Sequence, residues 1–367
     1  MNIKSLLLGS AAALAAVLAG GVPGLHAADA IVAATPEPLE YVRICDAYGA
    51  GYFYIPGSET CLKIGGYVRT EGKWYDAYNV ASRPGTLWHT RAHLTVDSAT
   101  DTEYGALKTN IVLRFDAVEP TESQKVLWAS ISLGGFLLGK TDSQYNSWFG
   151  YAGSVMNDDV IYDGPYELNQ FTYTYNAAGN GFTAVASLED SNSASDSFAY
   201  GGAWQKGKAD HYAPDGVLGL GYRADKFSFK VIGGYDSVVE EGAIKARIDA
   251  DFGVFKAFLM AGWNTDGSKL NKYAGSNQNA SGCPVGRGDL CGWGDWAVWG
   301  GASIPVNPKL SGNFQLAYSD SKIFEATANF QYKPVKNLTI TPELTYVNYD
   351  SIKAHTWAGV LRFQRNF

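Results

Sequence analysis

The stretch Tyr104-Gly-Ala-Leu-Lys-Thr-Asn-Ile-Val-Leu-Arg-Phe115 indicates the fold class of this 367-residue chain. Apolar residues recur in it at every second position, so Leu107 and Ile111 share one side, whereas Lys108 and Arg114 share the other. Successive side chains of a β-strand point to opposite faces. The stretch is therefore predicted to be a strand with one apolar face and one charged face.

The composition excludes several protein classes. Counts of 42 Gly, 10 Trp, 23 Tyr and 17 Phe favour strands and turns, and 18 % charged residues is below the roughly 25 % usual for soluble domains. A mean hydropathy of -0.13 excludes a bundle of apolar membrane helices. The formal net charge is -7 and no Lys/Arg run is present, which argues against nucleic-acid binding.

The first 27 residues have the pattern of an export signal. Lys4 precedes an apolar stretch from Leu6 to Val22, and small residues follow a Pro-Gly break, so cleavage is expected after Ala27. The alternative, a membrane anchor, is less well supported because no flanking charges follow the stretch and its end is rich in Ala. Residues 28–61 are then predicted to form a periplasmic N-terminal segment, and 62–367 a membrane domain.

Four cysteines fit an oxidising compartment. Of the three possible connectivities, the two local pairs are the simplest: Cys45 with Cys61, and Cys283 with Cys291.

Short turns and long loops alternate down the chain, as in outer-membrane barrels. Sixteen strands are expected, an even number that places both termini on one side. The segments with defined bounds are 62–73, 87–98, 103–115, 126–133, 136–142, 168–176, 181–189, 338–349 and 355–367, and the remaining strands meet at turns near 224–226, 251–253, 305–308 and 334. The predicted fold is thus an all-β, 16-stranded antiparallel transmembrane β-barrel with long external loops.

The sequence contains no Gly-x-Ser-x-Gly, His-Glu-x-x-His, P-loop or dinucleotide-binding motif. His89 and His93 lie about 13 Å apart along a strand, too far to share a metal. Neither catalysis, nor a metal, nor a cofactor is therefore expected. Asp158 and Asp159 could form an acid pair, but a solvated acidic patch is the preferred interpretation.

A barrel of sixteen strands leaves a water-filled lumen. The stretch 143–167 combines carboxylates with aromatic residues and contains no Lys or Arg, so it could fold inward and anchor to the barrel wall. Its acidic groups would then face inward-pointing bases across a narrow gap, which creates a transverse field. Ordinary solvated lumen charges without a constriction are an equally acceptable interpretation of the composition.

Three segments resemble the general porins of alphaproteobacterial outer membranes. They are Met1-Asn-Ile-Lys-Ser-Leu-Leu-Leu-Gly-Ser, Tyr41-Val-Arg-Ile-Cys-Asp-Ala-Tyr-Gly-Ala-Gly-Tyr-Phe-Tyr-Ile-Pro-Gly and Glu59-Thr-Cys-Leu-Lys-Ile-Gly-Gly-Tyr-Val-Arg69. The terminal Phe367 resembles the signal read by the barrel-assembly machinery, although Arg365 stands where a hydrophobic residue is common.

The resemblance implies a homotrimeric channel in the outer membrane of a Gram-negative bacterium, in contact with lipid and lipopolysaccharide and passing small hydrophilic solutes and ions by passive diffusion. It implies that the loop 143–167 folds into the barrel as a constriction, and it supports a Cys45–Cys61 disulfide. By position, the acidic side would be Asp158, Asp159, Asp163 and Glu167, and the basic wall Arg69, Arg91, Lys108 and Arg114. A one-residue slip in register would invert each strand.

Two alternative functions remain open at this point. A substrate-selective channel would be favoured by an aromatic slide along the lumen, and only scattered inward aromatics are predicted. An adhesin or receptor barrel would use the long loops at 190–215 and 264–295 to bind a partner.

Overall fold

The computed structural model describes residues 43–76, 85–118, 120–156, 161–176, 181–191, 213–269, 271–274 and 292–367. The predicted export signal and most of the segment before Arg43 lie outside these residues, as do Cys283 and Cys291. Residues 42–367 form one compact unit. None of the helices in the described ranges has the length and apolar character needed to cross a membrane.

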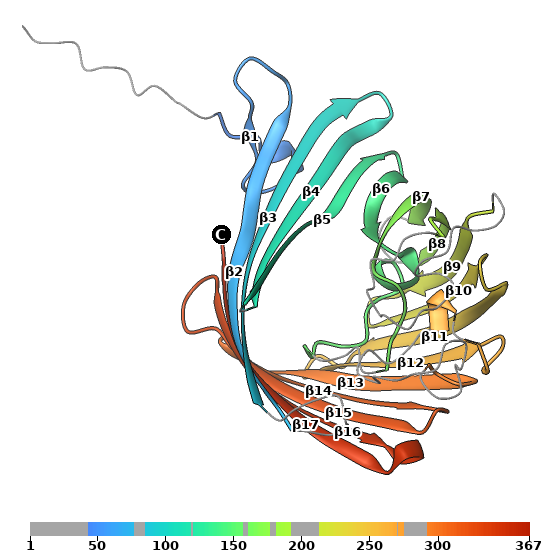
Figure 1. The fold of residues 1–367 in the computed structure, drawn as a ribbon. Coiled ribbons are helices and arrows are strands. Elements are labelled where there is room, and N and C mark those ends of the chain that lie inside the picture. Colours follow the sequence, from blue (N-terminus) through green and yellow to red (C-terminus); the bar gives the residue numbers. More distant parts are fainter. Residues whose placement is uncertain are drawn as a thin grey trace, which may run out of the picture. The chain divides into compact units, whose positions relative to one another are not determined.

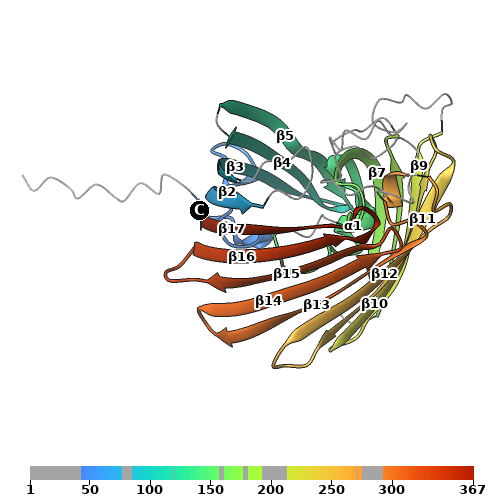
Figure 2. The same cartoon turned by 60° about the horizontal axis from the view of Figure 1, so that its bottom comes forward.

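The described chain is almost entirely β-sheet (Figures 1 and 2). The strands are β1 (Phe53–Tyr54), β2 (Cys61–Tyr75), β3 (Gly85–Thr102), β4 (Gly105–Val118), β5 (Thr121–Leu133), β6 (Phe136–Asp142), β7 (Glu167–Asn176), β8 (Gly181–Glu189), β9 (Asp215–Arg223), β10 (Phe227–Asp236), β11 (Glu241–Asp251), β12 (Lys256–Asn264), β13 (Trp296–Asn307), β14 (Leu310–Ser319), β15 (Ile323–Tyr332), β16 (Leu338–Tyr349) and β17 (Ala354–Asn366). The helical turns are η2 (Asp46–Tyr48), α1 (Gln144–Ser147), η3 (Lys272–Ala274) and η4 (Asp350–Ile352).

Strands β2 to β17 close a 16-stranded antiparallel barrel, which confirms the predicted fold. Each strand pairs with its neighbours in the chain, and β17 pairs with β2 from Ala358↔Tyr75 to Asn366↔Tyr67. The last residue completes the closure, because Phe367 and Gly66 exchange backbone hydrogen bonds of 3.0 and 3.2 Å. The short β1 is an extra strand that pairs with the start of β2.

Several strands are longer than the sequence predicts. β3 starts two residues earlier and ends four residues later than expected, and β5 begins at Thr121 rather than at 126. The register of β4 with β5 shifts between Val112 and Leu113, opposite Val126 and Trp128. The extra residue, Leu127, lies within the predicted segment. The first part of β5 was missed because residues 121–125, Thr-Glu-Ser-Gln-Lys, contain no apolar side chain.

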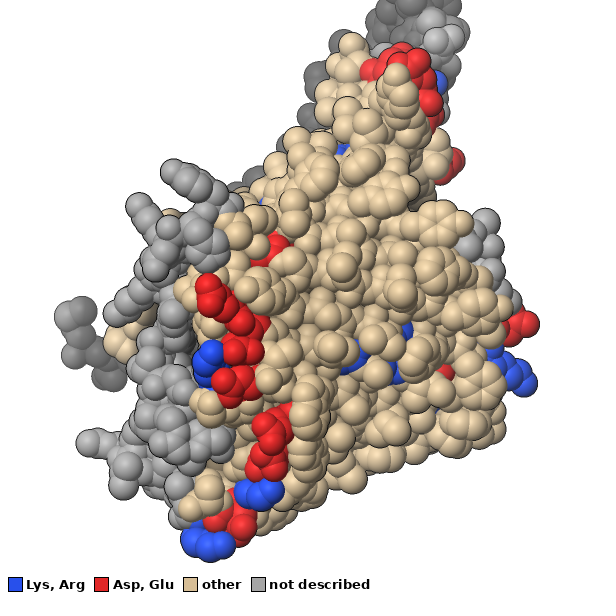
Figure 3. Space-filling view, turned by 90° about the vertical axis from the view of Figure 1, so that its right-hand side faces the viewer, with Lys and Arg blue, Asp and Glu red and all other residues tan. Residues whose placement is uncertain are grey.

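The outer surface of the barrel is largely apolar, as a membrane-facing surface requires. The exposed fractions of four representative apolar side chains range from 44 to 70 %: Leu218, Leu220, Ile244 and Ile248. In Figure 3 uncharged residues form a broad field on one side of the molecule, and most Asp, Glu, Lys and Arg side chains gather along its margins.

A disulfide joins Cys45 to Cys61, as the resemblance implied. It closes a loop of 16 residues onto the first residue of β2. In the chain-entropy account a loop of this size contributes about 3 kcal/mol.

We expect the double variant Cys45→Ser, Cys61→Ser to release the segment before β2 while leaving the barrel closed, because the strand ladders do not include residues 43–60 apart from β1. Limited proteolysis should cut the variant in this segment at least about tenfold faster than the parent protein. Equal cleavage rates would contradict a role for the disulfide in holding the segment.

Candidate functional site

In the segment between β6 and β7, residues 143–166, the described residues 143–156 and 161–166 enter the interior of the barrel (Figure 1). We call this segment the inner loop. It starts with α1, whose first residues are held in place because Ser143 accepts a hydrogen bond from the Tyr145 backbone N–H and donates one to Glu189. Bulky side chains follow: Tyr145, Phe149 and Ile161 are at most 2 % exposed and pack against the walls of β8 to β16.

Small residues in the wall make room for the aromatic rings above them. A Cβ on Gly219 would collide with the Trp148 ring, and one on Gly234 would collide with the Tyr273 ring. Trp293 lies over Gly262 in the same way. The rings of two other external segments, 271–274 and 292–295, thus pack into the barrel beside the root of the inner loop.

Three cations of the barrel wall hold the inner loop by its carbonyl oxygens. Lys230 of β10 donates to the carbonyls of Trp148 and Phe149, and Arg247 of β11 donates through Nη1 to Tyr151 O at 2.7 Å. Backbone carbonyl groups of a loop are not paired within a β-sheet and need other hydrogen-bond donors. A charged donor forms a stronger hydrogen bond with them than a neutral one.

Lys245 is the buried member of this set. Its side chain is fully enclosed, its Nζ donates to Asn146 Oδ1 at 2.9 Å and to Asp163 O at 2.6 Å, and it lies 4.2 and 4.7 Å from the ring centres of Tyr145 and Phe149. Burial of an ammonium group is costly unless the group is hydrogen-bonded and paired. Lys245 therefore fixes both arms of the inner loop at once.

Asp163, a residue of the inner loop, is buried rather than exposed to the water of the lumen. It is 1 % exposed, and it accepts hydrogen bonds from the Ala152 backbone N–H and from Asn146 Nδ2. Burial raises the pKa of the Asp163 carboxyl, and the neighbouring Lys245 ammonium opposes that rise. The sequence placed this carboxylate on the acidic side of a pore, whereas the structure makes it an anchor of the loop.

Further along the inner loop, two backbone carbonyl groups accept hydrogen bonds from side chains of β13 and β15. Asn329 of β15 donates to Ser154 O at 3.1 Å, and Trp299 of β13 donates to Ile161 O at 3.0 Å. The loop thus covers the inner face of β10 to β16. The inner faces of β2 to β5 and of β17 make none of these contacts with it among the described residues.

That remaining face carries a dense group of charges, which we call the charged wall. It contains six cations and three carboxylates around His89: Arg69, Lys73, Arg91, Arg114, Lys125 and Arg362, with Glu71, Asp116 and Glu167. Cations therefore outnumber carboxylates by three. The side chains point inward because they occupy one parity of each strand, opposite to Ile64, Val68 and Phe115 on the outer surface.

Each carboxylate of the charged wall ties several cations together. Glu71 lies 2.6 Å from Arg362 Nε and 3.2 Å from Lys73 Nζ, and so joins the last strand to the first. Asp116 contacts Arg91 Nε at 2.5 Å and Arg114 Nε at 3.0 Å.

His89 lies between two of these carboxylates. Its Nδ1 is 3.2 Å from Glu71 Oε2 and its Nε2 is 2.6 Å from Asp116 Oδ1. His89 thereby connects Glu71 of β2 with Asp116 of β4. Among the residues with described placement, no group of three His, Cys, Asp or Glu side chains is arranged to hold a metal ion.

The structure brings some of the residues singled out in the sequence together and separates others. Arg69, Arg91 and Arg114 all belong to the charged wall. Lys108 faces the lumen but lies six residues from Arg114 on β4, about 20 Å along the strand. Glu167 begins β7 and contacts Lys125 at 2.7 Å, so its carboxylate is part of the charged wall itself. Asp158 and Asp159 lie outside the described residues.

Sequence reasoning missed half of the cations of the charged wall, and all three that hold the inner loop. Lys245 and Arg247 alternate with Ile244 and Ile248, which signals an inward position, but nothing local indicates that they reach a segment about 80 to 100 residues earlier. Arg362 likewise lies between the apolar residues Leu361 and Phe363, an alternation that indicates an inward position.

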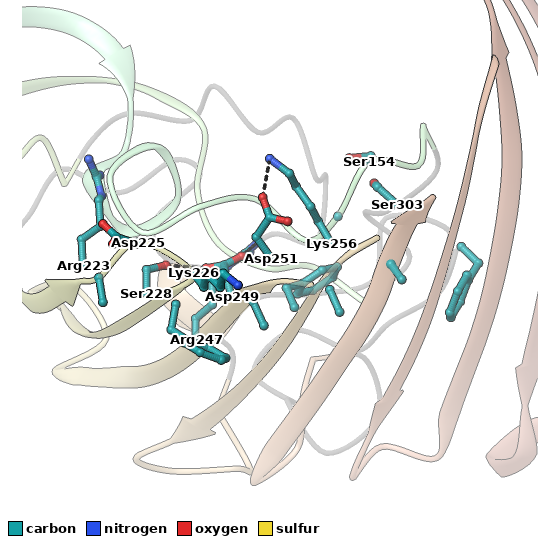
Figure 4. A pocket seen from close by; sticks show the side chains of 18 residues that line it. Ser154, Arg223, Asp225, Lys226, Ser228, Arg247, Asp249, Asp251, Lys256 and Ser303 are labelled. Carbon is teal, nitrogen blue, oxygen red and sulfur yellow. Dashed lines mark hydrogen bonds and ion pairs between the residues drawn. The ribbon is translucent and has the colours of Figure 1, made fainter. Parts of the chain in front are cut away.

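A hollow of about 390 Å³ lies beside the inner loop on the side of the turns that follow β9 and β11 (Figure 4). Ser154 of the loop borders it, with Arg223, Ser228 and Ser303 on the barrel side. Some of the charged side chains that line the hollow form ion pairs. Arg247 donates hydrogen bonds to Asp249 through Nε and Nη2, and Lys256 Nζ lies 3.2 Å from Asp251 Oδ2.

Comparison with known proteins gives concordant results. Residues 29–363 match the family described as Porin subfamily. Porin Omp2b of Brucella suis biovar 1 (strain 1330) is 40 % identical over 388 aligned positions, and Porin Omp2b of Brucella neotomae is 41 % identical; in both cases the alignment covers 100 % of each chain.

Solved structures share the fold at low sequence identity. The outer membrane channel DcaP of Acinetobacter baumannii superposes with a TM-score of 0.65 at 15 % identity, covering 86 % of this chain and 99 % of that one. An anion-selective porin from Comamonas acidovorans gives 0.57 at 14 % identity, covering 84 % and 100 %.

Proposed function

Because the chain belongs to the porin subfamily, we propose that its solute path runs between the inner loop and the charged wall. Membership of this family makes the protein a passive diffusion channel in the outer membrane of a Gram-negative bacterium. The family consists of channel proteins. What the proposal adds is the place where passing solutes meet the strongest field.

The observation that carries the proposal is the division of the lumen. The inner loop fills the space along β10 to β16 and leaves the charged wall facing what remains. Six cations against three carboxylates make this side of the passage positive, and a low-dielectric surrounding strengthens the potential. A ring or stripe of one sign selects ions in a pore.

The opposite side of the field would be supplied by the tip of the inner loop. Of the four carboxylates assigned there from the sequence, Asp163 is buried and Glu167 pairs with Lys125, so we place the counter-charge on Asp158 and Asp159. The proposed field is therefore asymmetric and dominated by the cations of the wall.

We also propose that the working unit is a homotrimer that meets through the outer face of β3 to β5. Thr90, Glu122 and Gln124 border a hollow of about 520 Å³ on that outer face. Polar and charged groups facing lipid are costly, so a protein partner suits this surface better. The remaining outer surface would contact lipid and lipopolysaccharide, and Phe367 would serve the barrel-assembly machinery.

Single-channel recording of the refolded protein in a planar bilayer tests these proposals. We expect large steps that close in threes, and a reversal potential across a KCl gradient that indicates a preference for chloride. A cation preference would contradict the dominance of the charged wall, steps that never group in threes would contradict the trimer, and absence of conductance would contradict the proposed path.

A further inference from the structure

The four arginines of the charged wall all contact their neighbours through the inner nitrogen Nε. Three of them donate a hydrogen bond from Nε, whereas Arg114 makes an ion-pair contact without hydrogen-bond geometry. The contacts are Arg69 with Gln364 Oε1 at 2.9 Å, Arg91 with Asp116 Oδ1 at 2.5 Å, Arg362 with Glu71 Oε1 at 2.6 Å, and Arg114 with Asp116 Oδ2 at 3.0 Å.

This arrangement leaves the outer forks of the guanidinium groups, Nη1 and Nη2, without a carboxylate within hydrogen-bond distance in the part of the chain that the structure describes. The nearest such contacts are Arg69 Nη1 to Glu71 and Arg114 Nη1 to Glu167, both 3.8 Å, which is too long for a hydrogen bond. Arg91 also hydrogen-bonds the Tyr67 side chain, a neutral partner.

The four side chains are partly accessible. The exposed fractions of the Arg69, Arg91, Arg114 and Arg362 side chains are 15, 17, 23 and 21 %. A small solute in the passage can therefore contact these side chains.

The strand register gathers the four forks into one patch. Arg69 and Arg91 are direct partners across β2 and β3. Arg114 pairs with His93, two residues along from Arg91, and Arg362 pairs with Glu71, two residues along from Arg69. Neighbouring strands lie about 4.8 Å apart, so the patch spans about 14 Å over four strands.

We propose that these forks form a transient binding station for oxyanions, namely solutes that carry a carboxylate or phosphate group. Two parallel N–H groups of an arginine match two oxygens of such a group, a geometry that a lysine ammonium does not offer. The inference rests on the proposed solute path and adds to it a preference that chloride, a spherical ion, does not share.

The surroundings keep the station weak enough for transport. Glu71 and Asp116 already offset part of the positive charge, and several forks side by side let a solute move from one to the next. Conduction requires binding that is favourable enough to enter and weak enough to leave.

The test measures chloride current through the full-length mature channel in a planar bilayer while inorganic phosphate, or acetate in a second series, replaces chloride at constant ionic strength. We expect a saturable reduction of the current. In the variant Arg69→Lys, Arg91→Lys, Arg114→Lys the charge is kept and the forks are lost, so the apparent phosphate affinity should fall at least about tenfold.

Arg223→Lys is the matched control, because Arg223 lies on β9 outside the charged wall and should leave phosphate affinity unchanged. Saturable block by either oxyanion supports the station and identifies the group that it prefers. Equal phosphate affinity in the triple-lysine variant overturns it, as does absence of block by both anions.

Failure of this inference is distinguishable from failure of the proposed function. A channel that conducts KCl with the expected chloride preference but shows no block contradicts only the oxyanion station. Heat-modifiable mobility on SDS gels verifies that the triple-lysine variant is a folded barrel before its affinity is interpreted.

Discussion

Replacing Lys245 with methionine is expected to free the inner loop without opening the barrel. The variant loses the hydrogen bonds to Asn146 and to the Asp163 carbonyl, and it leaves the buried Asp163 carboxylate without its nearest ammonium group. Hydrogen bonds to a charged group contribute about 1.5–3 kcal/mol each, so the loss of both costs about 3–6 kcal/mol. That cost raises the population of the undocked loop by about two to four orders of magnitude.

The expected readout is a channel with larger and noisier open-state current, because the loop no longer stays against β10 to β16. The thermal midpoint of barrel unfolding should change little, since the strand ladders are made by the backbone. Lys256→Met is the control: it removes an ammonium group from the next strand, where the side chain is 73 % exposed and forms an ion pair with Asp251. Identical current noise in the two variants would show that Lys245 does not hold the loop.

The second large effect is expected at Glu71, which we would replace with glutamine. This side chain is 2 % exposed and lies within 3.2 Å of Arg362, Lys73 and His89. Loss of its charge raises the excess of cations on the charged wall from three to four, so the reversal potential should shift further toward chloride. It also removes the ion pair between the first and last strands of the closed barrel, at a cost of about 3 kcal/mol.

Both effects can be measured on one preparation, by reversal potential across a KCl gradient and by the temperature of the heat-modifiable shift on SDS gels. Glu122→Gln makes the same chemical change on the outer face of β5 and should leave the reversal potential unaltered. A Glu71→Gln channel whose reversal potential matches the parent would contradict the assignment of this wall to the solute path.

Much of the barrel could be predicted from the sequence because it depends on local patterns. The alternation around Leu107 and Lys108 assigns each side chain of β4 to the membrane or to the lumen, and all sixteen strands were anticipated. The prediction was least accurate in the first part of β5, because residues 121–125 are all polar and show no alternation.

The candidate site was predicted less completely. The inward positions of Arg69, Arg91 and Arg114 followed from strand parity. The buried position of Asp163 did not, because its environment is made by Lys245, which lies 82 residues further along the chain. A run of acidic and aromatic residues looks the same whether its carboxylates face water or a cation of the opposite wall.

The chain's alternation of apolar and polar residues is sufficient to specify a barrel and the face on which each residue lies, since successive Cβ atoms of a strand point in opposite directions wherever the strand is placed. The pairing of the charges was decided by closure of the sheet. Glu71 and Arg362 are 291 residues apart in sequence and become neighbours only when β17 pairs with β2. The electrostatic interaction between them depends on a separation of a few ångström, and only the tertiary structure determines that separation.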